Sequence, residues 1–356
     1  MDAEAPGSIA ETLLRQLPLS PDAYPQSVDF ARESALVVLL DANSYRTASF
    51  LDDRILGPGM SGAWLPFGRV VEASLQVRNA RPLHFVFHTG HVGSTLLTRL
   101  LEEGGAVFAL REPLPLRTLA QAHDALGRFD SLLSPGAFDV ALSTFMRLWS
   151  RGYPAMHSVL VKATSVAGRL AAPILAANAG SRAVYMNLRA EPYLATLLAG
   201  ENSSIDLRGH GPERIRRLQS YTAGPLPPLH ELSPGELAAM SWLCESCTQR
   251  GVAERFPGRV MTLDFDDFLA GVGDSMLCVL AHLALPRNDK TVSAMSASPA
   301  LTRYSKAPEH TYTPELRAEI LRDSRRDNRE EIRKGMAWLE ARARSDGALA
   351  RIFNGT

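Results

Sequence analysis

The stretch of sequence that decides the fold runs from Leu83 to Leu101 and reads LHFVFHTGHVGSTLLTRLL. Its first six residues form a short apolar run, which is typical of a buried strand, and His84 inside this run is expected to be structural. From Ser94 to Glu103 apolar side chains recur at helical spacing. The stretch therefore predicts a strand, a turn that contains two glycines, and a helix.

The turn, Thr89–Thr95, has the composition of an anion-binding loop. Its glycines let the backbone approach a ligand closely, and the free amides and dipole of the following helix favour a negative charge. Ser94 and Thr95 add hydroxyl donors. The alternative is a plain glycine turn in which Ser94 caps the helix. The predicted ligand-binding residues of the loop are Gly90, His91, Val92, Gly93, Ser94 and Thr95.

The loop differs from the standard nucleotide-binding pattern G-x-x-x-x-G-K-[ST], whose lysine reaches the outer phosphates. Gly93 is followed directly by Ser94, and the loop contains no lysine. This difference disfavours a kinase or nucleotide hydrolase that depends on ATP or GTP and magnesium, although that class stays open as an alternative.

Short strands alternate with helices along the rest of the chain. Further strands are predicted at Ala106–Leu110, Ser158–Lys162, Ala183–Leu188 and Arg259–Phe265. Helices are predicted at Leu114–Ala125, Pro135–Trp149, Val166–Ala177, Glu236–Glu254 (opened by a capping box at Ser233-Pro234-Gly235-Glu236) and from Thr313 to about Arg344. This alternation predicts an α/β protein with a three-layer P-loop core, in which helices flank a mainly parallel sheet.

We expect three parts along the chain. Residues 1–80 form a mixed, mostly helical extension, in which Val37–Leu40 is either a short strand or a buried helix. Residues 81–300 form the α/β core, and residues 301–356 form a basic loop and a C-terminal helix packed on the core.

Composition narrows the class of protein. The chain has 38 Lys and Arg against 38 Asp and Glu, so no net charge attracts nucleic acid or anionic lipid. Three sparse cysteines, Cys244, Cys247 and Cys278, suit a reducing compartment better than a disulfide framework. The acidic first residues do not resemble a signal peptide, and no apolar run is long enough to span a bilayer. These features predict a cytoplasmic protein.

The loop resembles that of sulfotransferases that use 3′-phosphoadenosine 5′-phosphosulfate. In this family a strand leads into a loop of the type P-[KR]-S-G-[ST]-T and then into a helix that begins with leucines or tryptophan. His88–Leu97 is similar to that shape, with Gly93, Ser94 and Thr95 on the family's Gly-Ser/Thr-Thr. His91 falls where the family has Lys or Arg, a cation that neutralises charge on the bridging oxygen as the sulfuryl group leaves. A protonated imidazole can do the same.

Two later segments extend the resemblance. Leu160–Thr164 (LVKAT) looks like the family strand that ends in lysine and threonine, which implies that Lys162 lies near donor and acceptor. Ala183–Leu197 looks like the strand, Arg-x-Pro turn and helix that hold the donor's 3′-phosphate, with Arg189 on the family arginine. The family serine falls at Leu197 or one residue later, so Thr196 is the nearest hydroxyl.

The segment Arg303-Tyr304-Ser305-Lys306 resembles the family's basic C-terminal loop, which closes over the nucleotide. The resemblance therefore implies that Arg303 and Lys306 contribute to donor binding. From the residues alone, Lys162 is otherwise a lysine that emerges into solvent, and Arg189 is otherwise the start of a loop.

Glu112 is the predicted catalytic base. Arg111-Glu112-Pro113 follows the second core strand, which places it at the same edge of the sheet as the loop. Related sulfotransferases have a Glu or His base in this region, which takes the acceptor's proton. The alternative is a structural salt bridge from Glu112 to Arg111 or Arg117.

Two other patterns have simpler explanations. Cys244 and Cys247 form a C-x-x-C inside a predicted helix, where they read as small apolar residues, not as a redox pair or a zinc site. Asp264, Asp266 and Asp267 are the residues that would hold magnesium in a nucleotide hydrolase, but a helix cap and a salt bridge explain them more simply. No metal site is predicted.

The resulting hypothesis is transfer of a sulfuryl group from 3′-phosphoadenosine 5′-phosphosulfate to a hydroxyl or amine of a small-molecule, glycan or peptide acceptor. His91, Glu112 and Lys162 are the catalytic candidates. A non-catalytic nucleotide-binding protein of the same fold is the second alternative, because His91 replaces a permanent cation and the family serine is missing.

Overall fold

The structure is a computed structural model, and it describes residues 6–200, 203–305, 307 and 309–353. The acidic first residues and Lys306 lie outside the described residues. The chain divides into two compact units: the first comprises Met1–Phe87, Thr95–Ala183 and Met276–Ser298, and the second comprises His88–Ser94, Val184–Ser275 and Pro299–Thr356. The division expected at residues 80 and 300 stays a prediction.

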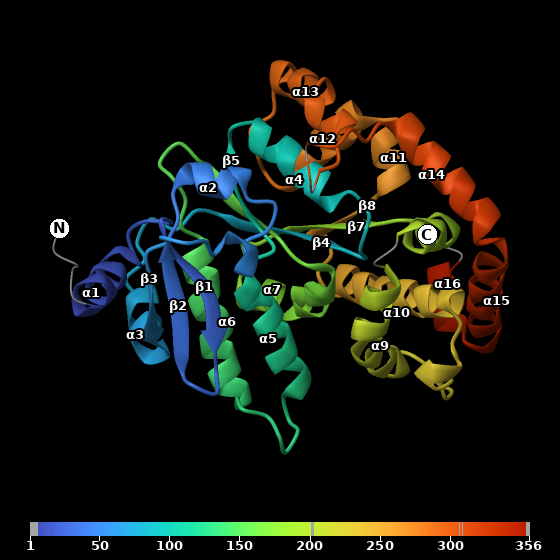
Figure 1. Cartoon of the computed structure of the whole chain (residues 1–356), viewed down its shortest axis with the longest axis horizontal. Coiled ribbons are helices and arrows are strands. Elements are labelled where there is room, and N and C mark those ends of the chain that lie inside the picture. Colours follow the sequence, from blue (N-terminus) through green and yellow to red (C-terminus); the bar gives the residue numbers. More distant parts are fainter. Residues whose placement is uncertain (1–5, 201–202, 306, 308, 354–356) are drawn as a thin grey trace. The chain divides into compact units, whose positions relative to one another are not determined.

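The core sheet has five strands in the order β5-β6-β4-β7-β8 (Figure 1). β6 pairs in parallel with both β4 and β5, and every residue of β4, β5, β6 and β7 is buried. Parallel strands that are covered on both faces are typical of α/β proteins, so the predicted fold class is confirmed. The strands are β4 (Leu83–His88), β5 (Val107–Arg111), β6 (Ser158–Lys162), β7 (Ala183–Asn187) and β8 (Val260–Asp264).

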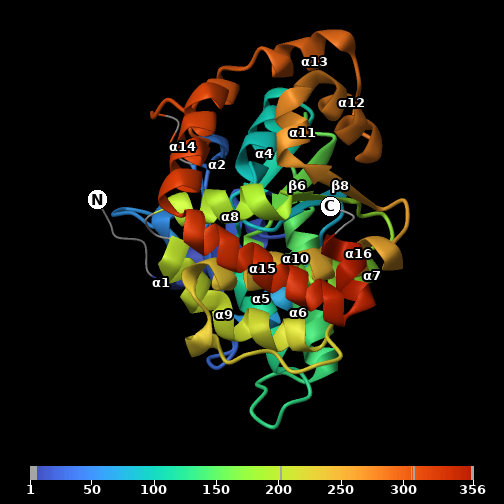
Figure 2. The same cartoon turned by 90° about the vertical axis from the view of Figure 1, so that its right-hand side faces the viewer.

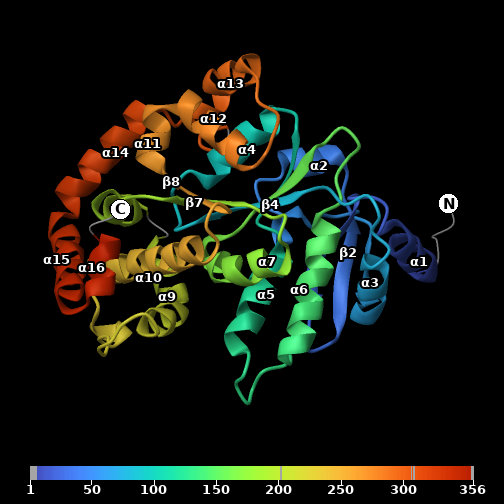
Figure 3. The ribbon, with the colours of Figure 1, turned by 180° about the vertical axis from the view of Figure 1, so that it is seen from behind.

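Several helices begin and end where the sequence predicted. These are α4 (Ser94–Glu103), α5 (Leu114–Ala125) and α6 (Pro135–Trp149). α5 and α6 lie side by side in the first unit (Figure 3). The helix predicted over 166–177 is instead a 3-10 turn, Ser165–Leu170, followed by α7 (Ala171–Ala177).

The N-terminal residues contain an antiparallel sheet, of which the sequence indicated only one strand, as one of two possibilities for Val37–Leu40. β1 (Ala23–Asp29), β2 (Ser34–Leu39) and β3 (Gly62–Pro66) form an antiparallel sheet in that order. α1 (Pro6–Gln16) contacts β3, and α3 (Phe67–Ser74) contacts both β3 and α6. β1 was not recognised because its sequence, AYPQSVD, lacks the alternation of apolar and polar residues that marks a half-buried strand. α2 (Ala42–Thr47) is the remaining helix of the N-terminal residues. Later in the chain, α13 (Asp289–Ser296) and most of α12 (Val272–His282) also belong to the first unit.

The second unit is built around a long buried helix. α10 (Pro234–Arg255) begins with the predicted capping box between Ser233 and Glu236. α15 (Arg329–Ser345) packs on α10 (Figure 2), so closely that a Cβ on Gly235 would lie 1.8 Å from the carbonyl oxygen of Glu331. The other helices are α8 (Ala190–Ala199), α9 (Ser203–Gln219), α11 (Phe265–Ala270), α14 (Pro314–Asp327) and α16 (Gly347–Phe353).

The prediction of a single C-terminal helix from Thr313 to about Arg344 is wrong, because α14 and α15 are separate helices that meet at Asn328. The Asn328 side chain donates hydrogen bonds to the Leu198 carbonyl and to Ser324 Oγ, which fixes the corner between the two helices against the end of α8. No helix in the described part of the chain is both long and apolar enough to cross a membrane.

Candidate anion-binding and catalytic site

The loop after β4 has an unusual backbone. Gly90, His91 and Gly93 have φ angles of 103°, 56° and 70°, all in the left-handed region. For His91 this conformation costs about 1–2 kcal/mol, and such outliers persist where the surrounding structure holds them. Left-handed residues in a short turn are a feature of backbone nests that bind anions. The conformation therefore fits the predicted anion-binding role of the loop.

Hydrogen bonds within the second unit hold the start of the loop. The Thr89 N–H donates to the Met186 carbonyl of β7 at 3.1 Å, and the Tyr193 hydroxyl of α8 donates to the Thr89 carbonyl at 3.0 Å. The Gly90 N–H donates to Nδ1 of His88 at 3.1 Å. Tyr193 and His88 are both buried, so packing restrains the two side chains that hold the start of the loop.

Gly93 is required for space as well as for conformation. A Cβ at this position would lie 2.0 Å from Cε2 of Phe265, the first residue of α11. Arg317 of α14 lies on the same ring, with its guanidinium carbon 5.1 Å from the ring centroid. Phe265 therefore covers the loop glycine, a contact that no sequence pattern indicated.

Two threonine hydroxyls of the loop are orphaned. Thr89 and Thr95 are buried, and Oγ1 of each finds no hydrogen-bond partner among the residues that the structure describes. A buried hydroxyl without a partner costs about 1–3 kcal/mol. Thr95 was predicted as a ligand-binding residue and Thr89 was not. Unsatisfied hydroxyl groups at both ends of the loop fit a site that a polar ligand completes.

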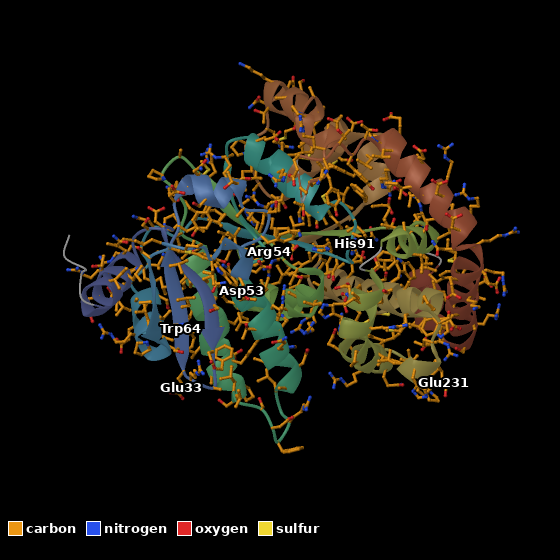
Figure 4. The ribbon with its side chains drawn as sticks, viewed as in Figure 1. Glu33, Asp53, Arg54, Trp64, His91 and Glu231 are labelled. Carbon is orange, nitrogen blue, oxygen red and sulfur yellow. The ribbon has the colours of Figure 1, made fainter. Side chains whose placement is uncertain are left out.

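His91, which is labelled in Figure 4, is exposed. A carboxylate, that of Asp206, lies within its electrostatic reach. Asp206 of α9 forms a pair with His210, in which Oδ1 and Nε2 are 3.3 Å apart. The pKa of Asp206 is lowered, chiefly by the hydrogen bond with His210 and to a smaller extent by the charges of Arg214 and His91. An ionised carboxylate therefore lies within electrostatic reach of His91.

In the first unit, Glu112 and Lys162 form a buried ion pair. Lys162 Nζ contacts Glu112 Oε1, and the two side chains are 1% and 11% exposed. Their backbones are also joined, because the Glu112 N–H donates to the Lys162 carbonyl at 2.7 Å. Like His91, Glu112 is a non-glycine residue in the left-handed region, with a φ of 52°. The structure thus brings two of the three catalytic candidates into direct contact.

The salt-bridge alternative for Glu112 named the wrong partner. Arg111 instead pairs with Glu102 at 2.6 Å, and its guanidinium also donates to carbonyls at the end of α2, among them that of Ala48 at 2.8 Å. Lys162 does not emerge into solvent, since it is among the largest fully buried side chains.

The residues proposed for the second phosphate belong to the second unit. Arg189 precedes α8, and its Nη1 lies 3.4 Å from Oδ1 of Asp267, with the side chain 48% exposed. The Thr196 hydroxyl donates to the Pro192 carbonyl at 2.7 Å, so its proton is used within the helix. Arg303 is exposed and forms an isolated bridge with Thr311. Lys306 lies outside the described residues.

The simpler explanations for the aspartates and cysteines are confirmed. Asp264 caps α11 by accepting from the N–H groups of Asp266 and Asp267, and Asp266 pairs with Arg317 at 2.7 Å. Burial raises the pKa of Cys247 to about 12, so the C-x-x-C has no reactive thiolate at neutral pH. Within the described residues, no three His, Cys, Asp or Glu side chains gather in a way that could hold a metal ion.

No family model matches the chain, and no curated protein matches its sequence. Among solved structures, it is similar to the sulfotransferase domain from the curacin biosynthetic pathway (TM-score 0.40, 14% identity, covering 67% of this chain and 86% of that one). It is also similar to the sulfotransferase STF9 of Mycobacterium avium (TM-score 0.39, 12% identity, 92% and 98% covered). A third match is the sulfotransferase domain of the Synechococcus PCC 7002 olefin synthase (TM-score 0.37, 15% identity, 69% and 95% covered).

Proposed function

We propose that the protein transfers a sulfuryl group from 3′-phosphoadenosine 5′-phosphosulfate to a hydroxyl or amine. The observation that carries this proposal is the Thr89–Thr95 loop. It combines three left-handed residues with buried, unsatisfied hydroxyls and contains no lysine. Such a loop suits a phosphosulfate, whose oxygens accept from backbone amides and hydroxyls, better than a nucleoside triphosphate with its magnesium ion.

The loop residues have distinct roles in this proposal. Gly93 lets the backbone approach the phosphosulfate, and Ser94 and Thr95 donate hydrogen bonds to it. His91 supplies positive charge near the bridging oxygen when its imidazole is protonated. Arg189 binds the 3′-phosphate and exchanges its present partner Asp267 for the ligand.

Glu112 and Lys162 act on the acceptor. Lys162 pairs with the Glu112 carboxylate and holds its orientation. Glu112 takes the proton of the acceptor's hydroxyl or amine while the acceptor atom forms its bond to sulfur. The bond between sulfur and the bridging oxygen breaks, and 3′-phosphoadenosine 5′-phosphate leaves. Catalysis by positioning and charge stabilisation resembles that of phosphoryl transfer.

Calorimetry with 3′-phosphoadenosine 5′-phosphate and with ATP, each with and without magnesium, tests the proposal. We expect the bisphosphate to bind without magnesium. Arg189→Ala, which removes a charged donor to phosphate, and Ser94→Ala, which removes a neutral one, should each weaken bisphosphate binding about tenfold. Arg216→Ala is the matched control, because Arg216 is exposed in the same unit and has no ion pair with a described residue.

Other outcomes separate the alternatives. A preference for ATP with magnesium would replace the proposal with a kinase or nucleotide hydrolase. Binding of the bisphosphate without sulfuryl transfer to any acceptor, together with an inert Glu112→Gln substitution, would identify a non-catalytic member of the fold.

A further inference from the structure

A cavity of about 630 Å³ lies in the first unit, at the edge of the core sheet opposite to Lys162. Three stretches of chain line it: residues 18–22, which join α1 to β1, residues 78–81, which precede β4, and residues 151–154, which precede β6. A parallel strand rises about 3.3 Å per residue, so the five residues of β6 separate the cavity from Lys162 by roughly 15 Å. The cavity has the size of a site for a small organic ligand.

The Arg81 side chain is held at this cavity by the residues that precede β6. The Arg81 N–H donates to the Ser150 carbonyl at 2.8 Å, and its Nη2 donates to the Pro154 carbonyl at 3.1 Å. The stem of the side chain crosses Gly152, where an added Cβ would lie 3.2 Å from Cγ of Arg81. Two of the three lining stretches are therefore joined, and the Arg81 guanidinium has a defined place between them.

Arg151 is a buried cation in the lining, with 4% of its surface exposed. Its Nε donates to the Leu148 carbonyl at 2.6 Å, both Nη atoms donate to the Ala23 carbonyl at 3.1 Å, and Nη1 also contacts the carbonyls of Leu17 and Ser20. All of these acceptors are neutral. Burial lowers the pKa of Arg151 to about 10, so the guanidinium is still charged at neutral pH. Buried charges are normally paired, yet no described carboxylate forms an ion pair with Arg151.

The ionisable groups of the lining leave an excess of positive charge. Its cations are Arg78, Arg81 and Arg151, and its one carboxylate is Asp22. Asp22 Oδ1 accepts from the Tyr153 hydroxyl at 2.6 Å, and neither it nor the three arginines form an ion pair with any described residue. The lining therefore carries two positive charges that no carboxylate of the cavity balances.

A further carboxylate outside the lining does not remove this excess. The charge of Asp41 acts on Tyr153 and helps to raise the pKa of that hydroxyl, although burial and the hydrogen bond with Asp22 act more strongly. Asp41 is not a lining residue, and its Oδ1 caps α2 by accepting from the Ser44 N–H at 2.7 Å. Even if the charge of Asp41 is counted in full, the cavity keeps a net positive charge.

We propose that this cavity binds a small organic phosphate monoester, whose phosphate lies among the guanidinium groups of Arg78, Arg81 and Arg151. A phosphate monoester carries a charge of about −1.5 to −2 at pH 7, which matches the excess of the lining, and guanidinium groups bind phosphate oxygens by charge-assisted hydrogen bonds. Leu19 and three prolines of the lining supply apolar surface for the organic part. The site goes beyond the proposed function, because it is separate from Glu112 and Lys162 and requires no sulfuryl transfer.

Calorimetry on the full chain at about pH 8, where the phosphate is a dianion, tests this site. The probes are phenyl phosphate, the monoanion benzoate and the neutral benzyl alcohol. We expect phenyl phosphate to bind saturably, benzoate to bind more weakly, and benzyl alcohol not to bind. Arg78→Gln should weaken phenyl phosphate binding about tenfold. Arg78 is exposed and its side chain forms no hydrogen bond or ion pair with a described residue, so this variant keeps the internal contacts intact.

Three further variants locate the binding. Arg147→Gln is the matched control, because Arg147 is exposed in the same unit, has no ion pair with a described residue and does not line the cavity. Asp22→Asn keeps an acceptor for the Tyr153 hydroxyl but removes the negative charge, so it should tighten phenyl phosphate binding severalfold. Ser94→Ala should leave this binding unchanged, since Ser94 belongs to the loop after β4.

The inference is overturned if phenyl phosphate does not bind, if benzoate or benzyl alcohol binds as tightly, or if Arg78→Gln and Arg147→Gln behave alike. Weaker binding in Asp22→Asn, or a loss in Ser94→Ala as large as that in Arg78→Gln, would also overturn it, because the probe would then occupy another site. Binding through Arg78 in a protein that does not bind 3′-phosphoadenosine 5′-phosphate would support this site and remove only the sulfotransferase proposal.

Discussion

Replacement of Gly93 by alanine tests how the anion-binding loop is held. Gly93 has a φ of 70°, and an added Cβ would lie 2.0, 2.4 and 2.5 Å from three atoms of the Phe265 ring. The left-handed conformation alone costs an alanine about 1–2 kcal/mol. Displacing a buried ring adds about 1–3 kcal/mol. We therefore expect Gly93→Ala to lower the free energy of unfolding by roughly 2–5 kcal/mol.

Gly258→Ala is a control that isolates the contact with Phe265. Gly258 belongs to the same unit and has a φ of 74°, but nothing lies within 4 Å of its added Cβ. Its substitution should cost only the conformational part, about 1–2 kcal/mol. The difference between the two variants therefore measures the cost of moving the ring.

Urea denaturation followed by circular dichroism gives both free energies from one type of experiment. The double variant Gly93→Ala, Phe265→Ala should cost less than the sum of the two single variants, because the alanine at 93 no longer meets a ring. Equal destabilisation by Gly93→Ala and Gly258→Ala, or strict additivity with Phe265→Ala, would refute the packing of Phe265 on the loop.

Two further predictions concern buried titratable groups. Lys162→Met should destabilise the protein by about 3–5 kcal/mol in urea denaturation, because it leaves the Glu112 carboxylate buried without its partner; adding Glu112→Gln should recover part of this, and no recovery would contradict the pairing. Burial, followed by the charge of Arg182, lowers the pKa of His84 from 6.5 to about 4. The stability that the neutral imidazole contributes to the folded state is therefore fully present above pH 6.5, and it is lost as the pH falls towards 4. Between pH 7 and 4 the free energy of unfolding should therefore drop by up to about 3 kcal/mol more in the wild-type protein than in His84→Gln. If the free energies of the two proteins change in parallel with pH, the lowered pKa of His84 is contradicted.

The elements predicted correctly are those whose signals are local. β4, α4, α5, α6 and β6 begin and end at the expected residues. β6 is a short apolar run, and the other four have an apolar run or helical spacing with glycine, proline or a capping residue at one end. These signals act within one or two turns of chain. The composition of the anion-binding loop, with its glycines and hydroxyls, was predictable for the same reason.

The elements missed are those that depend on distant partners. β1 contains Pro25 and is a strand because β2 pairs with it, not because of its own composition. The chain bends at Asn328 because that side chain binds the Leu198 carbonyl, 130 residues earlier in the sequence. Local helix propensity across Asn328 indicates continuation, and only the docking against α8 explains the break.

The sequence by itself determined a strand, a glycine turn and a helix that together can bind an anion, because backbone conformation and helix dipole follow from neighbouring residues. Tertiary structure alone decided that Glu112 pairs with Lys162, 50 residues away, and that Tyr193 and Phe265 hold the loop. These partners are set by long-range packing, in which each contact depends on where the whole chain lies, and no local periodicity encodes them.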